Sequence, residues 1–149
     1  MRPKPTKVPG LFAEPSAEAV ARKIVEEEGA VLAVHGAEAA RRLGLTTQMQ
    51  TRHIFLTNGS RHRFRLGKAD VTIKSVSPKK LALAGRPAGL AHLALLYLGK
   101  EEVDHEVLTA IRDRLPKQEF QALIAAKRVL PGWLNAALWE FQQSSEAVI

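Results

Sequence analysis

The sequence predicts an α+β fold in which a small antiparallel sheet, a meander of strands, has helices packed on one side and leads into a C-terminal helical cluster. Two patterns indicate this. Residues 61–66 alternate strictly between arginine and less polar side chains, as in a strand with one wet face. After residue 80, hydrophobic side chains recur at helical spacing. The 149 residues, 46% of them hydrophobic, suit one domain with its own core.

The chain divides by composition into three parts. Residues 1–15 hold Pro3, Pro5, Pro9 and Pro15 and predict an extended arm or linker, because proline fixes φ and has no N–H donor. A single α+β domain follows over residues 16–142. The polar tail, residues 143–149, is expected to fray.

The first elements of the domain are short. A helix is expected to begin after an N-cap at Ser16 and to run through Glu28. Residues 31–34 form an apolar run that fits a buried strand. Residues 38–43 predict a short helix, which Gly44 ends in a left-handed cap conformation.

The strand meander is predicted over residues 53–74. Residues 53–57 are β-branched and aromatic and lead into Asn58-Gly59, the strongest short hairpin pattern. Residues 61–66 form the next strand, and Gly67-Lys68 a second turn. The alternation of Val71 and Ile73 with polar neighbours predicts the third strand.

The remainder is expected to be helical. Apolar stripes begin at Leu90, Val103 and Phe120, and a fourth helix starts at Pro131, which suits a first helical position. Gly99 and Pro116 end the first two of these helices.

Positive charge is concentrated in the middle of the chain. The net charge is +7, and residues 31–80 carry ten basic and two acidic side chains, net +8, so the flanking parts are close to neutral. A concentrated basic stretch attracts polyanions or an acidic protein surface. The alternative interpretation is a solvated strand face on which the arginines serve solubility.

Three arginines carry the strongest functional pattern. Arg61, Arg63 and Arg65 project from one face about 7 Å apart, from a rise of roughly 3.3 Å per residue. Such a ladder can hold phosphates or carboxylates by bidentate contact. No exposed aromatic side chain interleaves it, which disfavours base stacking. The predicted nucleic-acid-binding or partner-binding residues are Arg41, Arg42, Arg61, Arg63, Arg65, Lys68, Lys74, Lys79 and Lys80.

A second interpretation places DNA binding earlier in the chain. Residues 39–48 resemble the first helix and turn of a helix-turn-helix, so residues 36–57 are an alternative DNA-binding segment. That motif needs a recognition helix after Thr47, whereas the sequence there favours a strand. Thr47 and Gln48 either line a functional groove or cap the next element, and the structural interpretation is favoured.

Catalytic, metal and cofactor patterns are absent from the sequence. There is no cysteine, no nucleophile elbow and no glycine-rich phosphate loop. The histidines are scattered without metal-ligand spacing: His35, His53, His62, His92 and His105. The sequence therefore favours a non-catalytic domain with no metal or cofactor, and an uncharacterised enzyme is the third interpretation. Neither a secretory signal nor a membrane-spanning run is found, so a cytoplasmic protein is expected.

A family resemblance rests on three segments. The run from Gly36 to Gln48, the strand and turn at residues 54–59, and Leu130-Pro131-Gly132-Trp133 together resemble the carboxy-terminal domain of AbiEi-type antitoxins. These are transcriptional regulators of type IV toxin–antitoxin systems. The similarity covers roughly residues 10–142.

The resemblance implies a partner and an architecture. In that family an amino-terminal winged helix precedes this domain, and the expectation is that Arg2-Pro3-Lys4-Pro5 is the exit from such a wing, the winged helix itself being missing here. The carboxy-terminal domain is associated with neutralising a nucleotidyltransferase-like toxin, and the whole protein represses its own operon. The family supplies no catalytic residues to transfer.

Overall fold

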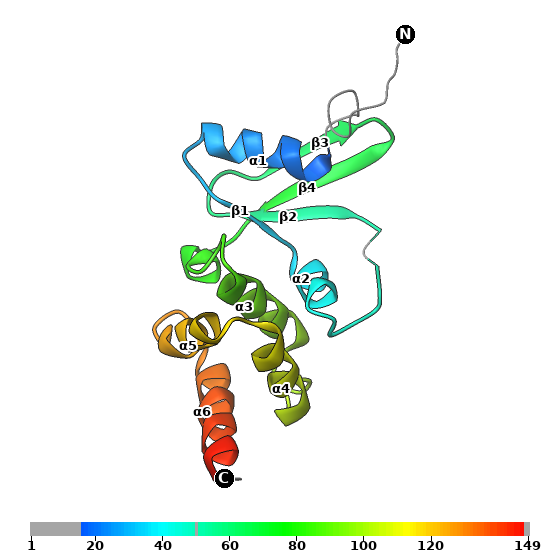
Figure 1. The fold of residues 1–149 in the computed structure, drawn as a ribbon. Coiled ribbons are helices and arrows are strands. Elements are labelled where there is room, and N and C mark those ends of the chain that lie inside the picture. The colour runs from blue at the N-terminus through cyan, green and yellow to red at the C-terminus, as the bar shows by residue number, and fades with distance from the viewer. Residues whose placement is uncertain (1–15, 50, 148–149) are drawn as a thin grey trace.

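A computed structural model of the chain describes residues 16–49 and 51–147. The α+β class is confirmed: within the described residues, helices pack on a four-stranded sheet and continue into a helical cluster that extends away from it (Figure 1). The elements are α1 (Ala17–Glu27), β1 (Leu32–Val34), α2 (Gly36–Arg42), β2 (His53–Thr57), β3 (His62–Leu66), β4 (Ala69–Ser75), the 3-10 helix η1 (Pro78–Leu81), α3 (Pro87–Leu98), α4 (His105–Arg114), α5 (Lys117–Ala125) and α6 (Gly132–Ala147).

Of the two predicted terminal segments, only part of the C-terminal tail can be compared with the structure. The proline-rich arm at residues 1–15 lies outside the described residues, as do residues 148–149. The tail was expected to fray after residue 142, but α6 continues to Ala147.

Helix starts follow the capping chemistry of the sequence. The Ser16 hydroxyl accepts the Ala19 N–H at 3.0 Å, as the predicted N-cap of α1 should. The Asp104 carboxylate does the same for α4, accepting from Val107 at 2.9 Å. At the end of α2, Gly44 has φ of 74°, which confirms its left-handed cap.

The order of the strands in the sheet differs from the prediction. The order is β1-β2-β4-β3, in which β1 pairs antiparallel with β2, β2 pairs parallel with β4, and β3 pairs antiparallel with β4. The predicted antiparallel meander is therefore wrong at its first step, because β2 and β3 are not neighbours. The second turn is confirmed: Gly67-Lys68 joins β3 to β4 as a two-residue hairpin loop with Leu66 opposite Ala69.

The chain leaves β2 in a turn that is fastened to the segment between α1 and β1. Asn58 Oδ1 accepts the Val31 N–H at 3.0 Å, and the Thr57 hydroxyl donates to the Val31 carbonyl at 2.8 Å. The Gly59 N–H donates to the same hydroxyl at 3.1 Å. These bonds turn the chain away from β2, so that β3 pairs at the far edge of the sheet.

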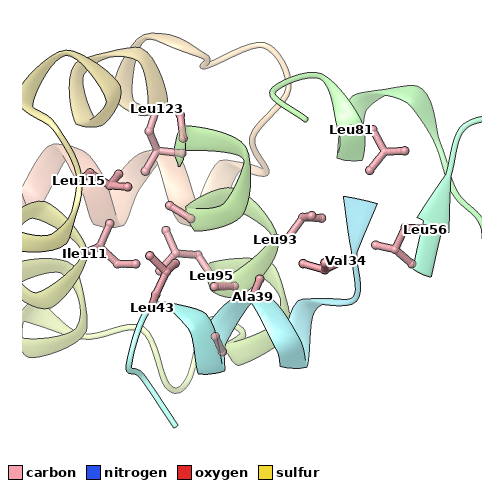
Figure 2. Close-up of a cluster of buried hydrophobic side chains, with 14 of the residues drawn as sticks. Val34, Ala39, Leu43, Leu56, Leu81, Leu93, Leu95, Ile111, Leu115 and Leu123 are labelled. Atoms are coloured by element: carbon pink, nitrogen blue, oxygen red, sulfur yellow. The ribbon is translucent and has the colours of Figure 1, made fainter. Parts of the chain in front are cut away.

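Helices cover both faces of β2, whereas the sequence predicted helices on one side. Phe55 and Leu56 are adjacent and therefore point to opposite faces, yet both are buried. In Figure 1, α1 lies along one side of β1 and β2, and α2 and α3 lie on the other. Figure 2 shows Leu56 pointing into the cluster that also contains Leu81 and Leu93.

The hydrophobic core extends from the sheet into the predicted helical cluster. Ile111 of α4 and Leu123 of α5 are fully buried, and Figure 2 shows them in the same cluster as Leu95 of α3. Within the described segments, no helix combines the length and apolar character that crossing a bilayer requires.

Candidate polyanion-binding face

The outer face of the β3–β4 hairpin displays the predicted arginine ladder. Along β3, Arg63 and Arg65 are exposed while Phe64 and Leu66 are half-buried, so the alternation expected from the sequence is confirmed. The register places Arg63 opposite Thr72 of β4. β3 is an edge strand of the described sheet, and the exposure of Arg63 and Arg65 shows that this part of the sheet face is open to solvent.

Residues of β3, β4 and the segment just before β3 line one open groove: Arg61, His62, Arg63, Thr72, Ile73, Lys74 and Ser75. Arg61 lies one residue before the His62–Ile73 pair, on the side of Lys74, and both line a groove of about 760 Å³ together with Arg63 and Thr72. We call Arg61, Arg63, Thr72 and Lys74 the basic face. Its three cations are exposed and form no ion pair with any described residue.

Arg65 belongs to the same ladder but has a partner. Its Nη1 lies 3.3 Å from Asp70 Oδ1 on the opposing strand, with the two side chains 66% and 70% exposed. An exposed pair of this kind contributes about 0–1 kcal/mol. Asp70 is the only carboxylate of β4, and it pairs with Arg65 beside the turn, at the end of the hairpin away from Arg61 and Lys74.

The other side of β3 is fastened to α1. His62 Nε2 lies 2.7 Å from Glu28 Oε2, and the Ser60 N–H donates to Oε1 of the same carboxylate at 3.3 Å. Phe64 packs against the core on this side. These contacts hold the inward side of β3 in place, and the alternation of the strand then directs Arg61 and Arg63 outward.

Arg41 and Arg42 do not join the basic face. Both lie on α2 and bind Glu38, Arg41 through Nε at 2.8 Å and Nη2 at 2.6 Å, and Arg42 through Nε at 2.8 Å. Arg42 also reaches Glu18 of α1 at 3.2 Å. The Arg41 hydrogen bonds are the main cause that lowers the pKa of Glu38 to about 2. Arg41 and Arg42 therefore pair with carboxylates of α1 and α2 and lie apart from the basic face, so their predicted binding role stays a prediction.

The lysines predicted for the face are spread over separate places. Lys68 lies in the hairpin turn, where its backbone carbonyl accepts a hydrogen bond from Arg65 Nη2 at 3.5 Å. Lys79 and Lys80 lie on η1 and line a different groove, together with His92 of α3 and Arg128. Neither Arg128 nor His92 was predicted as a site residue, because both are separated from the lysines along the chain and no local motif links them.

The candidate polar residues after α2 lie beside a third, smaller groove. Gln48 lines it with His35, Thr46 and Tyr97, whereas the exposed Thr47 does not. The Thr46 hydroxyl accepts the Gln48 N–H at 3.2 Å, which is a local turn contact. Burial, followed by the charges of Lys74 and Lys80, lowers the pKa of His35.

The helix-turn-helix interpretation is contradicted. After α2, the described residues 43–49 and 51–52 contain no helix, and the chain enters β2 at His53. No recognition helix is therefore available among the described residues of this segment.

Residues 16–49 and 51–147 contain no group of three or more histidine, aspartate or glutamate side chains placed to hold a metal ion.

Comparisons with known proteins identify a family. Residues 1–123 match the model of DUF6088, described as a family of unknown function. No curated protein and no solved structure matches the chain.

Proposed function

Since the chain belongs to the DUF6088 family of unknown function, we propose its function from its own geometry: a non-catalytic interaction domain whose basic face binds the phosphate backbone of a nucleic acid. One observation carries the proposal. Arg61, Arg63 and Lys74 are exposed side by side in one groove without a carboxylate partner among the described residues.

The placement of these charges has an energetic consequence. Directly opposed side chains on neighbouring strands lie about 5 Å apart, and like charges at that distance destabilise the sheet. Arg61 and Lys74 follow the last pair of the ladder, His62–Ile73, and line the same groove, so their like charges lie near each other, whereas Asp70 pairs with Arg65. A bound polyanion removes this repulsion and releases its own counterions, so both effects favour binding.

The chemistry of the face favours phosphodiester contacts over base recognition. Guanidinium groups bind phosphate oxygens through two parallel N–H bonds, and an edge strand leaves room for an extended backbone. The aromatic ring in the groove lining is that of His62, which is half-buried and held towards α1 by its 2.7 Å contact with Glu28, so it is poorly placed for base stacking. Binding of this kind depends strongly on salt and weakly on sequence.

A charge-matched pair of triple variants tests the proposal. The test variant is Arg61→Ala, Arg63→Ala and Lys74→Ala, and the control removes the same charge elsewhere through Lys23→Ala, Lys100→Ala and Lys117→Ala. Fluorescence anisotropy with labelled duplex DNA is measured over a series of salt concentrations. The slope of log K against log salt should fall by about 0.9 for each lost phosphate contact in the test variant only.

Two results would overturn this function. If the unaltered chain binds neither duplex nor single-stranded nucleic acid at low salt, the arginines only solvate the sheet and protect its edge strand. If both triple variants lose affinity equally, net charge rather than the basic face is responsible.

The resemblance to AbiEi-type antitoxins extends the proposal to a protein partner. In that setting the domain neutralises a nucleotidyltransferase-like toxin while the regulator acts on its own operon. The measurement is co-elution of this chain with the product of a neighbouring nucleotidyltransferase gene. Loss of co-elution in the basic-face variant, but not in its control, would place the toxin on the same surface.

A further inference from the structure

A second basic groove lies between η1, α3 and the segment that leads into α6. Its volume is about 510 Å³. The polar side chains that line it are Ser77, Lys79, Lys80, His92 and Arg128. We call it the His92 groove. It shares no lining residue with the basic face and therefore can bind a ligand of its own.

His92 is the unusual member of this lining. It lies on α3 among buried apolar side chains and is only 1% exposed, yet neither ring nitrogen has a hydrogen-bond partner among the described residues. An unpaired buried polar group destabilises a fold, because it gives up its hydrogen bonds to water and gains none in return. A leucine at this position would avoid that cost, so the imidazole is an unexplained polar group in the wall of the groove.

The charges around the ring all have one sign. Lys79, Lys80 and Arg128 are exposed and form no ion pair with a described residue, and the lining contains no carboxylate. Burial is the main cause that lowers the pKa of His92, and the charge of Lys80 lowers it further. At neutral pH the ring is therefore uncharged and offers one N–H donor and one acceptor.

We propose that the His92 groove binds a phosphate monoester or inorganic phosphate, with Arg128, Lys79 and Lys80 supplying the charge and the His92 ring donating a hydrogen bond. Arg128 offers a planar fork for two phosphate oxygens, and the lysines act as point charges. Because each ring nitrogen exposes less than 1 Å² in this structure, a phosphate reaches one of them only when lining side chains of the groove shift, and it then supplies the missing partner. A multiply charged anion fits three unpaired cations better than a single carboxylate does.

The first test uses the full chain and inorganic phosphate. The probe is titrated while the His92 ring and the backbone amides of residues 76–80 and 128–131 are followed by NMR. Arg128→Ala should weaken binding about tenfold, the loss of one charge-assisted contact. Its matched control, Lys127→Ala, removes a neighbouring exposed charge outside the lining and should leave the affinity unchanged. No shift at millimolar phosphate, or an equal loss in both variants, overturns the site.

A second variant separates ligand binding from structural packing. His92→Leu removes the unpaired polar group, so the unliganded protein should be equally stable or more stable while its phosphate affinity falls. Lower thermal stability together with unchanged phosphate affinity would show that the ring serves packing only, and would overturn its role as a donor.

The source of the phosphate is resolved by two further probes. A 5′-phosphorylated dinucleotide and the same dinucleotide with a 5′-hydroxyl are compared with inorganic phosphate. Tighter binding of the phosphorylated form identifies a terminal phosphate of a nucleotide, and preference for inorganic phosphate identifies the free ion. Equal binding of both dinucleotides would mean that a diester suffices and would overturn the monoester assignment. The basic-face triple variant should retain phosphate binding here, so this proposal and the proposed function fail independently.

Discussion

Glu119, in the first turn of α5, accepts hydrogen bonds from the guanidinium of Arg86 at 3.0 and 2.9 Å. Its Oε1 also accepts the Ala88 N–H at 3.0 Å, in the first turn of α3. Arg86 is the N-cap residue of α3, so one carboxylate ties the start of that helix to α5. The Arg86 hydrogen bond is the main cause that lowers the pKa of Glu119.

Replacement of this carboxylate should destabilise the helical cluster. Glu119→Gln keeps the shape but loses the charge that Arg86 and the N-terminus of α3 bind, so the urea midpoint should fall at an unchanged m-value. The control is Glu140→Gln, which removes an exposed carboxylate on α6 that has no partner among the described residues. Equal midpoints for the two variants would contradict the coupling of α3 to α5.

Glu38 should make stability sensitive to acid. Its folded pKa of about 2 lies below the ordinary value of 4.5 for a glutamate. A carboxyl with a lowered folded pKa stabilises the fold above its unfolded pKa, and this contribution is lost as the pH falls from about 4.5 through about 2. At neutral pH, Glu38→Gln should cost about 1 kcal/mol, because solvent screens these partly exposed pairs. Urea unfolding at several pH values checks this: the difference between the two proteins should shrink towards pH 2.

Gly89 should tolerate no side chain. A Cβ there would meet the backbone of the segment before α3, at 2.5 Å from the Leu83 carbonyl carbon and 3.1 Å from the Ala84 nitrogen. Gly89→Ala should therefore destabilise by about 1–3 kcal/mol, in the range of overpacked cores. Gly132→Ala is the control, since a Cβ at that position meets nothing within 4 Å and alanine favours the helix. Similar denaturant midpoints for the two variants would contradict the close approach of α3 to residues 83–84.

Truncation at the centre of α3 should be among the most costly changes in the core. Leu95 is 0% exposed, and Figure 2 shows it in the cluster that contains Ile111 and Leu123. Leu95→Ala should cost about 2–5 kcal/mol in urea unfolding. Met49→Ala, at a side chain that is 71% exposed, should stay within about 0.5 kcal/mol. A cost for Leu95→Ala as small as that control would mean that α3 does not form the centre of the core.

Elements with local causes were predictable from the sequence. The Ser16 cap, the Gly44 helix end and the Gly67-Lys68 turn each depend on contacts between residues close in the chain. Asn58-Gly59 was misinterpreted because the same residues also suit a turn that bonds to Val31, a partner 27 positions away. The continuous apolar run before it is typical of a strand buried on both faces, which a two-strand hairpin does not provide.

The candidate site residues also divide into those that local sequence predicts and those that only the fold brings together. Arg61 and Arg63 were predictable, since the period of a strand places them on one face before any tertiary contact is known. Arg41 and Arg42 were predicted for that face because the sequence does not show that Glu38 lies within reach of both. The His92 groove was not predictable, because η1, α3 and Arg128 meet only in the folded chain.

The amino-acid order alone determined the helices, the strands, their caps and the alternation that exposes the arginines, because those features follow from the few torsions and side chains within one or two turns. Only the tertiary structure decided which strand pairs with which, which cations pair with a carboxylate, and which have no carboxylate partner among the described residues. Those outcomes depend on burial and on distances between residues remote in the chain, which set both the hydrophobic gain and the electrostatic cost.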